Sequence, residues 1–391
     1  MAPLHLLTFS TLFPNNQQPN HGIFVENRLR HLLASGEASS EVVAPVPYFP
    51  STARLFGAWS RFAGVARRES RHGVTVHHPR YPVIPRLGMS VAPMLLYSAA
   101  LPFLRRLRDR GLRVDAIDAH YVYPDGVVAV WLGRKLGVPV VLTARGTDVN
   151  LIPRYAVPRR LIRGTLNGAA ALVAVSAALK GPLIELGAPA DKVTVLRNGV
   201  EIGLFRPPDD RAAARAALGI TRPTLLSVGG LIERKGHHLV IEALRTLPGW
   251  DLLIVGEGPE RARLAAQIGR LGLGDRARLL GVRPHTELPA LYGAVDALVL
   301  ASSREGWANV LLESMACGTP VVATNIWGNP EVVQNGDAGL IVERTAEAIA
   351  DGVRRLAAGP PTRAATRAYA ERFSWDDTTA GQLALFRRVI G

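Results

Sequence analysis

The sequence has a single cysteine, no long apolar run and no basic leader, and each of these absences narrows the class of protein. Cys317 is the one cysteine among 391 residues, so no internal disulfide can form and a reducing compartment fits. Residues 1–7 lack the basic start of a secretory signal. Residues 91–104 come nearest to a membrane span, but this run contains Pro93 and Pro102 and falls short of the ~18–20 residues required. We therefore expect a soluble, cytoplasmic protein.

Positive charge is concentrated in the first half of the chain. Residues 1–200 contain 24 Lys and Arg against 11 Asp and Glu (+13), whereas residues 201–391 contain 22 against 21 (+1). This asymmetry indicates that the first half meets an anionic surface or ligand. We expect no nucleic-acid partner, because the basic residues are scattered and lack interleaved aromatic residues or a known binding motif. Peripheral contact with an anionic membrane explains the basic residues at least as well as nucleic acid would. The alternative is that they form a solvated, Arg-rich surface without a partner.

Short apolar runs alternate with helical patterns throughout the chain, which is too long for a single core. The runs expected to form strands are residues 4–9, 41–44, 74–77, 116–119, 138–143, 171–175 and 193–196, and then 224–228, 251–255, 278–280, 297–300 and 320–323. This βαβα alternation predicts an α/β protein with two doubly wound, Rossmann-like parallel sheets. If the two sheets face each other, the carboxyl ends of their strands share a cleft, where open α/β sheets bind ligands.

Two prolines and two acids at residues 206–210 mark the break between the two halves. We expect an N-terminal domain over residues 1–202, which binds the acceptor, and a C-terminal domain over residues 203–370, which binds the nucleotide. Residues 371–391 are expected to form a helix that packs back on the N-terminal domain.

Glycine-bearing loops follow the first strands of the second half. Gly229 and Gly230 lead to Arg234 and Lys235 ahead of a helix. A phosphate fits such a place, because glycine permits close backbone approach, a helix N-terminus supplies free N–H groups, and lysine adds a full charge. Any α/β protein uses glycines in tight turns, however, so phosphate binding and an ordinary turn both remain open. Neither a dinucleotide fingerprint nor a Walker sequence is present.

Two carboxylates, Glu305 and Glu313, stand eight positions apart across a loop and a helix. The helix is expected from about residue 308 to residue 316, with Gly318 as its C′ residue. Glu305 is expected at the mouth of the cleft, and Glu313 faces the cleft only if this helix lines it. Carboxylates are strong acceptors for the hydroxyl pairs of ribose and other sugars. The alternative is that Glu305 is merely an acid near a helix N-terminus and that Glu313 faces solvent.

This arrangement resembles the E-x7-E signature of the retaining glycosyltransferases of family 4, which have the GT-B fold. The resemblance covers nearly the whole chain, and its other motifs are Gly22-Ile23-Phe24-Val25, Asp118-Ala119-His120, the loop from Val228-Gly229 to Lys235-Gly236, Cys317-Gly318-Thr319-Pro320, Gly328-Asn329-Pro330-Glu331 and Phe373-Ser374-Trp375. Within the family, residues 20–25 and 146–150 look most like the branch that assembles teichuronic acid and exopolysaccharides.

The resemblance implies a metal-independent hexosyltransferase that needs no cofactor and uses a UDP- or GDP-sugar as its donor substrate. It implies that Glu313 binds the ribose hydroxyls, that Glu305 binds the transferred sugar and that Lys235 neutralises the diphosphate. The other implied donor-binding residues are Gly22, Gly229, Arg234, Gly306, Trp307, Ala308, Asn309 and Val310. The implied acceptor is a growing cell-surface polysaccharide, expected on a lipid at the inner face of the plasma membrane.

Two positions depart from the family's pattern. Relatives carry a histidine where this chain has Arg145, and often an arginine where it has Gly230. Either Arg145 or Arg234 supplies the missing cation, or donor binding is weakened and activity is lost. Since a guanidinium releases no proton, we expect Arg145 to stabilise the leaving diphosphate and not to act as a base. His120, at the end of a strand, is either catalytic or a packed structural histidine.

Three classes of function therefore stay open: a transferase, a non-catalytic GT-B subunit that binds sugar nucleotides in a polysaccharide assembly complex, and a GT-B sugar-nucleotide epimerase. The basic first half disfavours the epimerase, because a small soluble substrate needs no such surface. No His/Cys spacing suggests a metal site.

Overall fold

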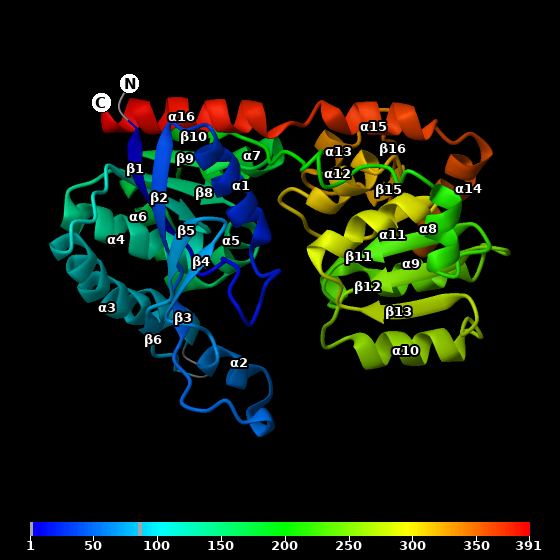
Figure 1. Ribbon diagram of the computed structural model, residues 1–391, viewed down its shortest axis with the longest axis horizontal. Coiled ribbons are helices and arrows are strands. Elements are labelled where there is room, and N and C mark those ends of the chain that lie inside the picture. Colours follow the sequence, from blue (N-terminus) through cyan, green and yellow to red (C-terminus); the bar gives the residue numbers. More distant parts are fainter. Residues whose placement is uncertain (1–2, 85–87) are drawn as a thin grey trace. The chain divides into compact units, whose positions relative to one another are not determined.

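The computed structural model describes residues 3–84 and 88–391, which form two compact units (Figure 1). Unit 1 consists of residues 1–197 together with residues 376–391, and unit 2 consists of residues 198–375. The chain therefore passes between the units twice, a few residues from the domain limits expected from the sequence.

Unit 1 is built on an eight-stranded sheet with the order β10-β9-β8-β7-β1-β2-β5-β4. Its strands are β1 (Leu4–Phe9), β2 (Ala38–Val43), β4 (Arg68–Arg71), β5 (Val74–His77), β7 (Ala116–His120), β8 (Val140–Ala144), β9 (Ala171–Ala174) and β10 (Val193–Val195). All neighbours are parallel except β4 and β5, which are joined by His72 and Gly73, both with positive φ, as a tight hairpin requires. A separate pair, β3 (Val46–Pro47) and β6 (Arg80–Tyr81), is also parallel.

Helices cover this sheet and complete its core. They are α1 (Ile23–Ala34), α3 (Gly88–Asp109), α4 (Val127–Leu136), α5 (Thr147–Asn150), α6 (Ala156–Gly168), α7 (Ala177–Glu185) and α16 (Trp375–Ile390). The short α2 (Ser60–Ala63) has no buried residue and belongs to the segment between β3 and β4. The last of these, α16, comes from the far end of the chain, and its buried Leu383, Leu385 and Phe386 pack in one cluster with strand residues such as Leu6 and Val141. The hydroxyl of Thr378 also donates a hydrogen bond to the carbonyl of Arg197. The end of the sequence is thus part of the core of unit 1.

The apolar run at residues 91–104 forms the middle of α3. Leu96, Ala100 and Leu104 recur every four residues and are fully buried, so this stripe of α3 packs inward. In the described part of the chain, no helix combines the length and the apolar content needed to cross a bilayer.

Unit 2 is built on a six-stranded, wholly parallel sheet with the order β13-β12-β11-β14-β15-β16. Its strands are β11 (Thr224–Val228), β12 (Asp251–Val255), β13 (Ala277–Gly281), β14 (Ala297–Leu300), β15 (Val321–Thr324) and β16 (Gly339–Val342). Its helices are α8 (Arg211–Ala217), α9 (His237–Leu244), α10 (Arg261–Arg270), α11 (Leu288–Ala294), α12 (Asn309–Ala316), α13 (Asn329–Val332), α14 (Ala346–Ala358) and α15 (Arg363–Glu371). The two doubly wound sheets predicted from the sequence are confirmed.

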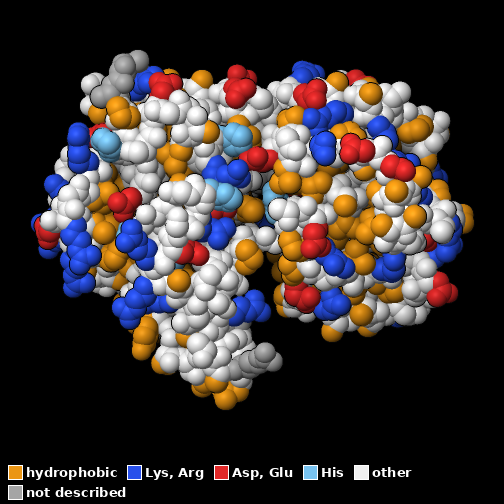
Figure 2. Space-filling model, in the orientation of Figure 1, with side chains coloured by type: hydrophobic (Ala, Val, Ile, Leu, Met, Phe, Trp, Pro, Cys, Tyr) orange, Lys and Arg blue, Asp and Glu red, His pale blue; other side chains and the backbone are white. Residues whose placement is uncertain are grey.

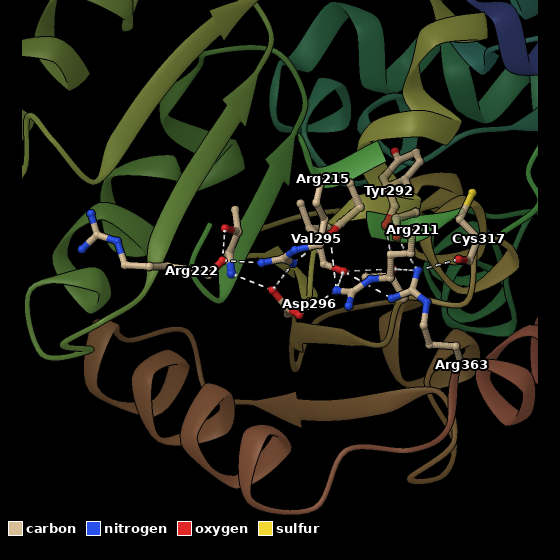
Figure 3. Close-up of polar contacts among 12 residues, drawn as sticks. Arg211, Arg215, Arg222, Tyr292, Val295, Asp296, Cys317 and Arg363 are labelled. Carbon is tan, nitrogen blue, oxygen red and sulfur yellow. Dashed lines mark hydrogen bonds and ion pairs between the residues drawn. The ribbon is translucent and has the colours of Figure 1, made fainter. Parts of the chain in front are cut away.

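A network of arginines ties the helices of unit 2 to the amino ends of its central strands (Figure 3). Asp296, just before β14, accepts hydrogen bonds from Arg211 (2.7 Å), from Arg215 (3.0 Å) and from the backbone N–H of Thr224 (2.8 Å). Arg363 donates to the carbonyls of Gly293 and Cys317. Ligands of open parallel sheets bind at the carboxyl ends of the strands. This network lies at the amino ends, so we assign it to the stability of the fold.

Candidate functional site

The side chains of Glu305 and Lys235 meet at the carboxyl ends of β11 and β14, which are neighbours in the sheet. The carboxylate of Glu305 accepts hydrogen bonds from the Lys235 ammonium (2.6 Å) and from the Ser302 hydroxyl (2.7 Å), and Arg234 lies 3.5 Å away. Burial alone would raise the pKa of Glu305, but the charges of Lys235 and Arg234 outweigh it and hold the pKa below the ordinary value. Glu305 is therefore an ionised carboxylate held between two cations.

The loops that carry these residues are fixed against each other by their backbones. Gly236 has φ 71°, and a Cβ there would lie 2.0 Å from the carbonyl oxygen of Ala301, so only glycine fits. The N–H of Ser303 donates to the carbonyl of Arg234 (2.8 Å), and the Arg234 guanidinium donates to the carbonyl of Arg304 (2.6 Å). The contact between Glu305 and Lys235 is thus preorganised by the fold.

Gly229 makes room for the stem of Lys235. It has φ 150°, and a Cβ there would lie 3.2 Å from Lys235 Cε. The carbonyl oxygen of Gly229 lies against Gly256, so a Cβ on Gly256 would come within 1.8 Å of that oxygen. Positive φ and close packing of the chain therefore require glycine at both Gly229 and Gly256. Gly230 differs, since the nearest atom to a Cβ there is the Glu257 carbonyl oxygen at 3.9 Å.

Glu313 lies inside α12 and is buried, so the reading that it faces solvent is wrong. The Tyr292 hydroxyl donates to one of its oxygens (2.9 Å), and His285 Nε2 lies 3.3 Å from the other. Tyr292 is fully buried, and this burial together with the charge of Glu313 raises its pKa well above the ordinary value. The ring of Phe205 packs edge-on against both His285 and Tyr292. Three aromatic side chains thus hold the carboxylate in one orientation.

The segment between the two glutamates is nearly enclosed. Gly306, Trp307 and Ala308 are buried, and the Trp307 ring contacts Phe373 at 6.1 Å between centroids. Asn309 begins α12 and accepts a hydrogen bond from Asn198 through its side chain (3.2 Å), and Val310 follows in the first turn. Five of the candidate donor-binding residues thus lie on the short path that joins Glu305 to α12.

Unit 1 carries a second polar cluster, at the carboxyl ends of β7 and β8. His120 lies with Nε2 3.2 Å from Asp118 Oδ2 and with Nδ1 2.8 Å from Arg145 Nη2. A guanidinium only donates, so Nδ1 accepts and Nε2 carries the proton that it donates to Asp118. Burial lowers the pKa of His120 in spite of Asp118, and Arg145 lowers it further. The imidazole is therefore neutral at pH 7, in a single tautomer.

Arg145 is held by more than His120. Its guanidinium lies 5.0 Å from the centre of the Phe24 ring, and Asp148 accepts hydrogen bonds from the backbone N–H groups of Arg145 and Gly146. Burial lowers the pKa of Arg145 to about 9, so it stays charged at neutral pH. The sequence predicted a contact between Arg145 and the diphosphate, and the structure shows Arg145 as the partner of His120.

Gly22 starts α1, the helix that presents Phe24 to Arg145. It has φ 69°, and a Cβ there would lie 2.3 Å from the carbonyl oxygen of Leu12. Glycine is therefore required at this position by the fold itself, whatever it contributes to ligand binding.

The sequence identified most of these residues but missed Tyr292. It lies in α11, on a helix with no motif, and only the packing of α11 against α12 brings it to Glu313. No group of three or more His, Cys, Asp or Glu in the described residues is arranged to hold a metal ion.

Comparison with known proteins places both units in recognised families. The family "Glycosyl transferases group 1" matches residues 210–373, and "Glycosyltransferase Family 4" matches residues 54–204. The D-inositol 3-phosphate glycosyltransferases of Mycobacterium bovis and Mycobacterium tuberculosis are 38% identical over 221 residues. That match spans 52% of this chain and 45% of each relative, so it covers about half the length of either protein.

Solved structures with the same fold cover the whole chain at lower identity. Sucrose-phosphate synthase from Thermosynechococcus elongatus has a TM-score of 0.80 at 21% identity and covers 99% of this chain and 98% of its own. HepE of Anabaena in complex with UDP has a TM-score of 0.73 at 21% identity, with 99% and 100% covered. Another HepE structure, in complex with UDP-glucose, has a TM-score of 0.73 at 22% identity, with 97% and 99% covered.

Proposed function

The chain belongs to the glycosyltransferases of family 4 and has their GT-B fold, and on this premise we propose that it transfers a sugar from a nucleotide diphosphate sugar. The observation that carries the proposal is the Lys235–Glu305 contact at the strand ends of unit 2, with the buried Glu313 held eight residues further on. HepE, which shares the fold, binds UDP and UDP-glucose, and this supports a sugar nucleotide as the donor.

Each of these three side chains suits one part of such a donor. Glu313 is an orientated carboxylate, and its remaining lone pairs suit the two hydroxyls of a ribose. Glu305 is ionised and suits the hydroxyls of the transferred sugar, and Lys235 supplies charge to the leaving diphosphate. Because Lys235 and the neighbouring Arg234 can offset the diphosphate charge, we propose a metal-independent reaction. From the resemblance to the retaining enzymes of the family, we propose that the reaction retains the configuration of the sugar.

For the acceptor, we propose a growing cell-surface polysaccharide carried on a lipid. The basic first half of the sequence, with its excess of 13 positive charges over residues 1–200, supports an anionic acceptor or surface. A second candidate is a small phosphorylated polyol, which the name of the mycobacterial relatives favours. Assays of each donor with both kinds of acceptor separate the two candidates.

The release of nucleoside diphosphate from UDP-, GDP- and ADP-sugars tests the proposed reaction. A transferase releases the diphosphate when an acceptor is present, a non-catalytic subunit binds the donor without release, and an epimerase changes the sugar nucleotide without net release. Binding of none of these donors would contradict all three classes.

The two glutamates should have separable roles. We expect Glu313→Gln to weaken nucleoside diphosphate binding by about 1.5–3 kcal/mol, because the ribose loses a charged acceptor. Glu305→Gln should reduce turnover and leave the diphosphate affinity nearly unchanged. Calorimetric titration of each variant with UDP and GDP measures the affinities, and Glu347→Gln, an exposed change on α14, is the control. An equal loss of diphosphate affinity in both variants would show that these roles are wrongly assigned.

We also propose that unit 1 contacts an anionic membrane, through a segment other than α3. Large apolar side chains are exposed around α2, at Tyr48 (59%), Leu55 (81%), Phe56 (44%) and Trp59 (42%). Figure 2 shows hydrophobic side chains at the tip of the segment that carries α2. Aromatic residues favour the membrane interface, and nearby arginines are attracted to anionic lipid. The exposed residues of this segment, and not the inward-facing stripe of α3, suit the membrane.

Sedimentation with anionic liposomes tests this contact. We expect binding at low salt that falls as salt screens the charges, and we expect Leu55→Ser/Trp59→Ser to weaken it roughly tenfold through lost apolar burial. Val282→Ser removes an equally exposed apolar side chain from unit 2 (60%) and should change little. Binding that is absent, or that does not respond to salt, would rule out the electrostatic contact.

A further inference from the structure

The loop after β15 contains a tryptophan in a strained backbone conformation. Trp327 has φ 43°, which lies in the left-handed region that glycine adopts freely and that is a clear outlier for a bulky residue. Strain of this kind persists only where the surrounding structure imposes it, and it gathers at active sites and ligand contacts. The conformation of Trp327 therefore indicates a role beyond the folding of the loop.

Hydrogen bonds from neighbouring residues hold this turn. The N–H of Ile326 donates to the carbonyl of Thr324 (2.9 Å), and the N–H of Asn329 donates to the carbonyl of Ile326 (3.0 Å). The side chain of Asn329, which is fully buried, donates a further hydrogen bond to the carbonyl of Thr324 (3.0 Å). None of these contacts uses the indole of Trp327, so the turn does not depend on the ring that it carries.

The indole of Trp327 is left partly exposed. Within the part of the chain that the structure describes, it takes part in no hydrogen bond and in no contact with another ring. By contrast, Trp307 is buried and its ring contacts Phe373. Tryptophan offers a large, flat apolar surface, and such side chains are enriched where proteins bind their partners. A ring that is carried on a fixed turn and left open is therefore available to a ligand.

The loop of Trp327 lies at the same strand ends as Glu305. The strands that precede the two loops, β14 and β15, are parallel neighbours in the sheet. The hydroxyl of Thr324, three residues before Trp327, donates to the carbonyl of Ser302 (2.7 Å), and the hydroxyl of Ser302 donates to the Glu305 carboxylate (2.7 Å). Two consecutive hydrogen bonds thus join the start of the Trp327 loop to the carboxylate that we assign to the transferred sugar.

Building on the proposed function, we propose that Trp327 determines which sugar is transferred, by stacking its indole on the apolar C–H face of the sugar ring whose hydroxyls Glu305 binds. A pyranose ring carries hydroxyls around its edge and C–H groups on its faces. The hydrogens of those C–H groups are slightly positive, and the negative face of an aromatic ring attracts them. An axial hydroxyl on the stacked face would hold the sugar away from the indole and would lose its water without a partner. The site therefore selects pyranoses with an unobstructed C–H face, and it discriminates between epimers.

Calorimetric titration of the full chain with UDP-glucose, UDP-galactose and GDP-mannose, and with UDP and GDP alone, tests the proposal. Trp327→Asn removes the ring, and asparagine tolerates the left-handed backbone, so the melting temperature should not fall. We expect this variant to bind the preferred sugar nucleotide about tenfold more weakly, because the aromatic contact and its apolar burial are lost. Its affinity for the nucleoside diphosphate alone should be unchanged. Trp327→Phe keeps an aromatic face and should retain most of the affinity.

Trp59→Asn is the control, since it removes an exposed tryptophan of unit 1 (42%) and should leave the binding of every nucleotide unchanged. A Trp327→Asn variant that binds sugar nucleotides as tightly as the wild type would overturn the role of Trp327. Equal losses of affinity for the sugar nucleotide and for the nucleoside diphosphate would overturn it as well, because the ring would then not act on the sugar. A wild-type chain that binds none of these nucleotides would instead contradict the proposed function, and this inference with it.

Discussion

Replacing Lys235 with methionine should lower the rate of sugar transfer by about 10²- to 10³-fold, the usual effect of removing one preorganised charge donor. Methionine keeps most of the apolar stem of Lys235, which packs so close to Gly229 that a Cβ on Gly229 would lie 3.2 Å from Lys235 Cε. The substitution therefore removes the positive charge and changes the packing little. Release of nucleoside diphosphate under saturating donor measures the effect. Lys135→Met removes an exposed lysine of α4 and should leave the rate unchanged.

Thermal unfolding of the same variant separates the catalytic role from the structural one. Lys235→Met leaves the Glu305 carboxylate nearly buried without its closest cation, so the free energy of unfolding should fall. Adding Glu305→Gln removes that charge, so the double variant should regain stability and still lack the rate. A double variant that recovered the rate would mean that Lys235 serves only to neutralise Glu305.

The same pair predicts how stability depends on pH. In the folded chain the pKa of Glu305 lies below its ordinary value, because Lys235 and Arg234 outweigh the effect of burial. A lowered pKa contributes stability that is present above the unfolded value and is lost as the pH falls through the folded one. Lys235→Met removes the main cause of the lowered pKa, so acid titration should cost this variant less stability than it costs the wild type.

Arg145→Ala should also lower turnover by about 10²- to 10³-fold, if Arg145 stabilises the leaving diphosphate as we propose. Arg145→Lys should recover only part of the rate, since a point charge cannot make the bidentate contact of a guanidinium. Arg145→His should stay well below the wild type, because an imidazole is mostly uncharged at neutral pH and does not replace the charge of the guanidinium. Initial rates at saturating donor measure all three, with the exposed Arg159→Ala as the control.

The hydrogen bond from Arg145 to His120 (2.8 Å) gives a way to tell this role from a positioning role. Loss of a phosphate contact reduces the rate by a similar factor across the neutral range of pH. Loss of the partner of His120 instead raises the pKa of the imidazole, because Arg145 is one cause of its lowered value, and the rate then changes with pH. A fully active Arg145→His variant would contradict the phosphate role, whereas a shifted pH profile in Arg145→Ala would show that Arg145 also positions His120.

The strands were predictable where burial on both faces demands continuous apolar sequence. The predicted limits of β11, β12 and β14 agree with the structure, since Leu, Ile and Val dominate the sequences of these strands of unit 2. The sequence of β4, Arg68–Arg71, has no such run, because this edge strand is half exposed and is held by its hairpin. The edge strand β16 was also missed, because its Gly339 start reads as a turn.

The candidate site shows a similar division between local and non-local information. Local sequence was enough to place Glu305 in a loop and Glu313 in a helix that ends at Cys317-Gly318. It could not reveal that Tyr292 donates to Glu313 or that Arg145 donates to His120, because these contacts join residues 21 and 25 positions apart. Each depends on which elements become neighbours in the fold.

The return of α16 to unit 1 has a consequence for how the protein is made. Unit 2 is one continuous stretch, residues 198–375, whereas the core of unit 1 includes Leu383, Leu385 and Phe386, which are synthesised after all of unit 2. The ribosome therefore delivers every residue of unit 2 before it delivers the final piece of unit 1. Domains usually fold as units in the order of synthesis, but here the N-terminal unit has to wait with part of its apolar core uncovered. We expect nascent chains that end before residue 376 to hold a folded unit 2 beside a unit 1 that proteases still cleave.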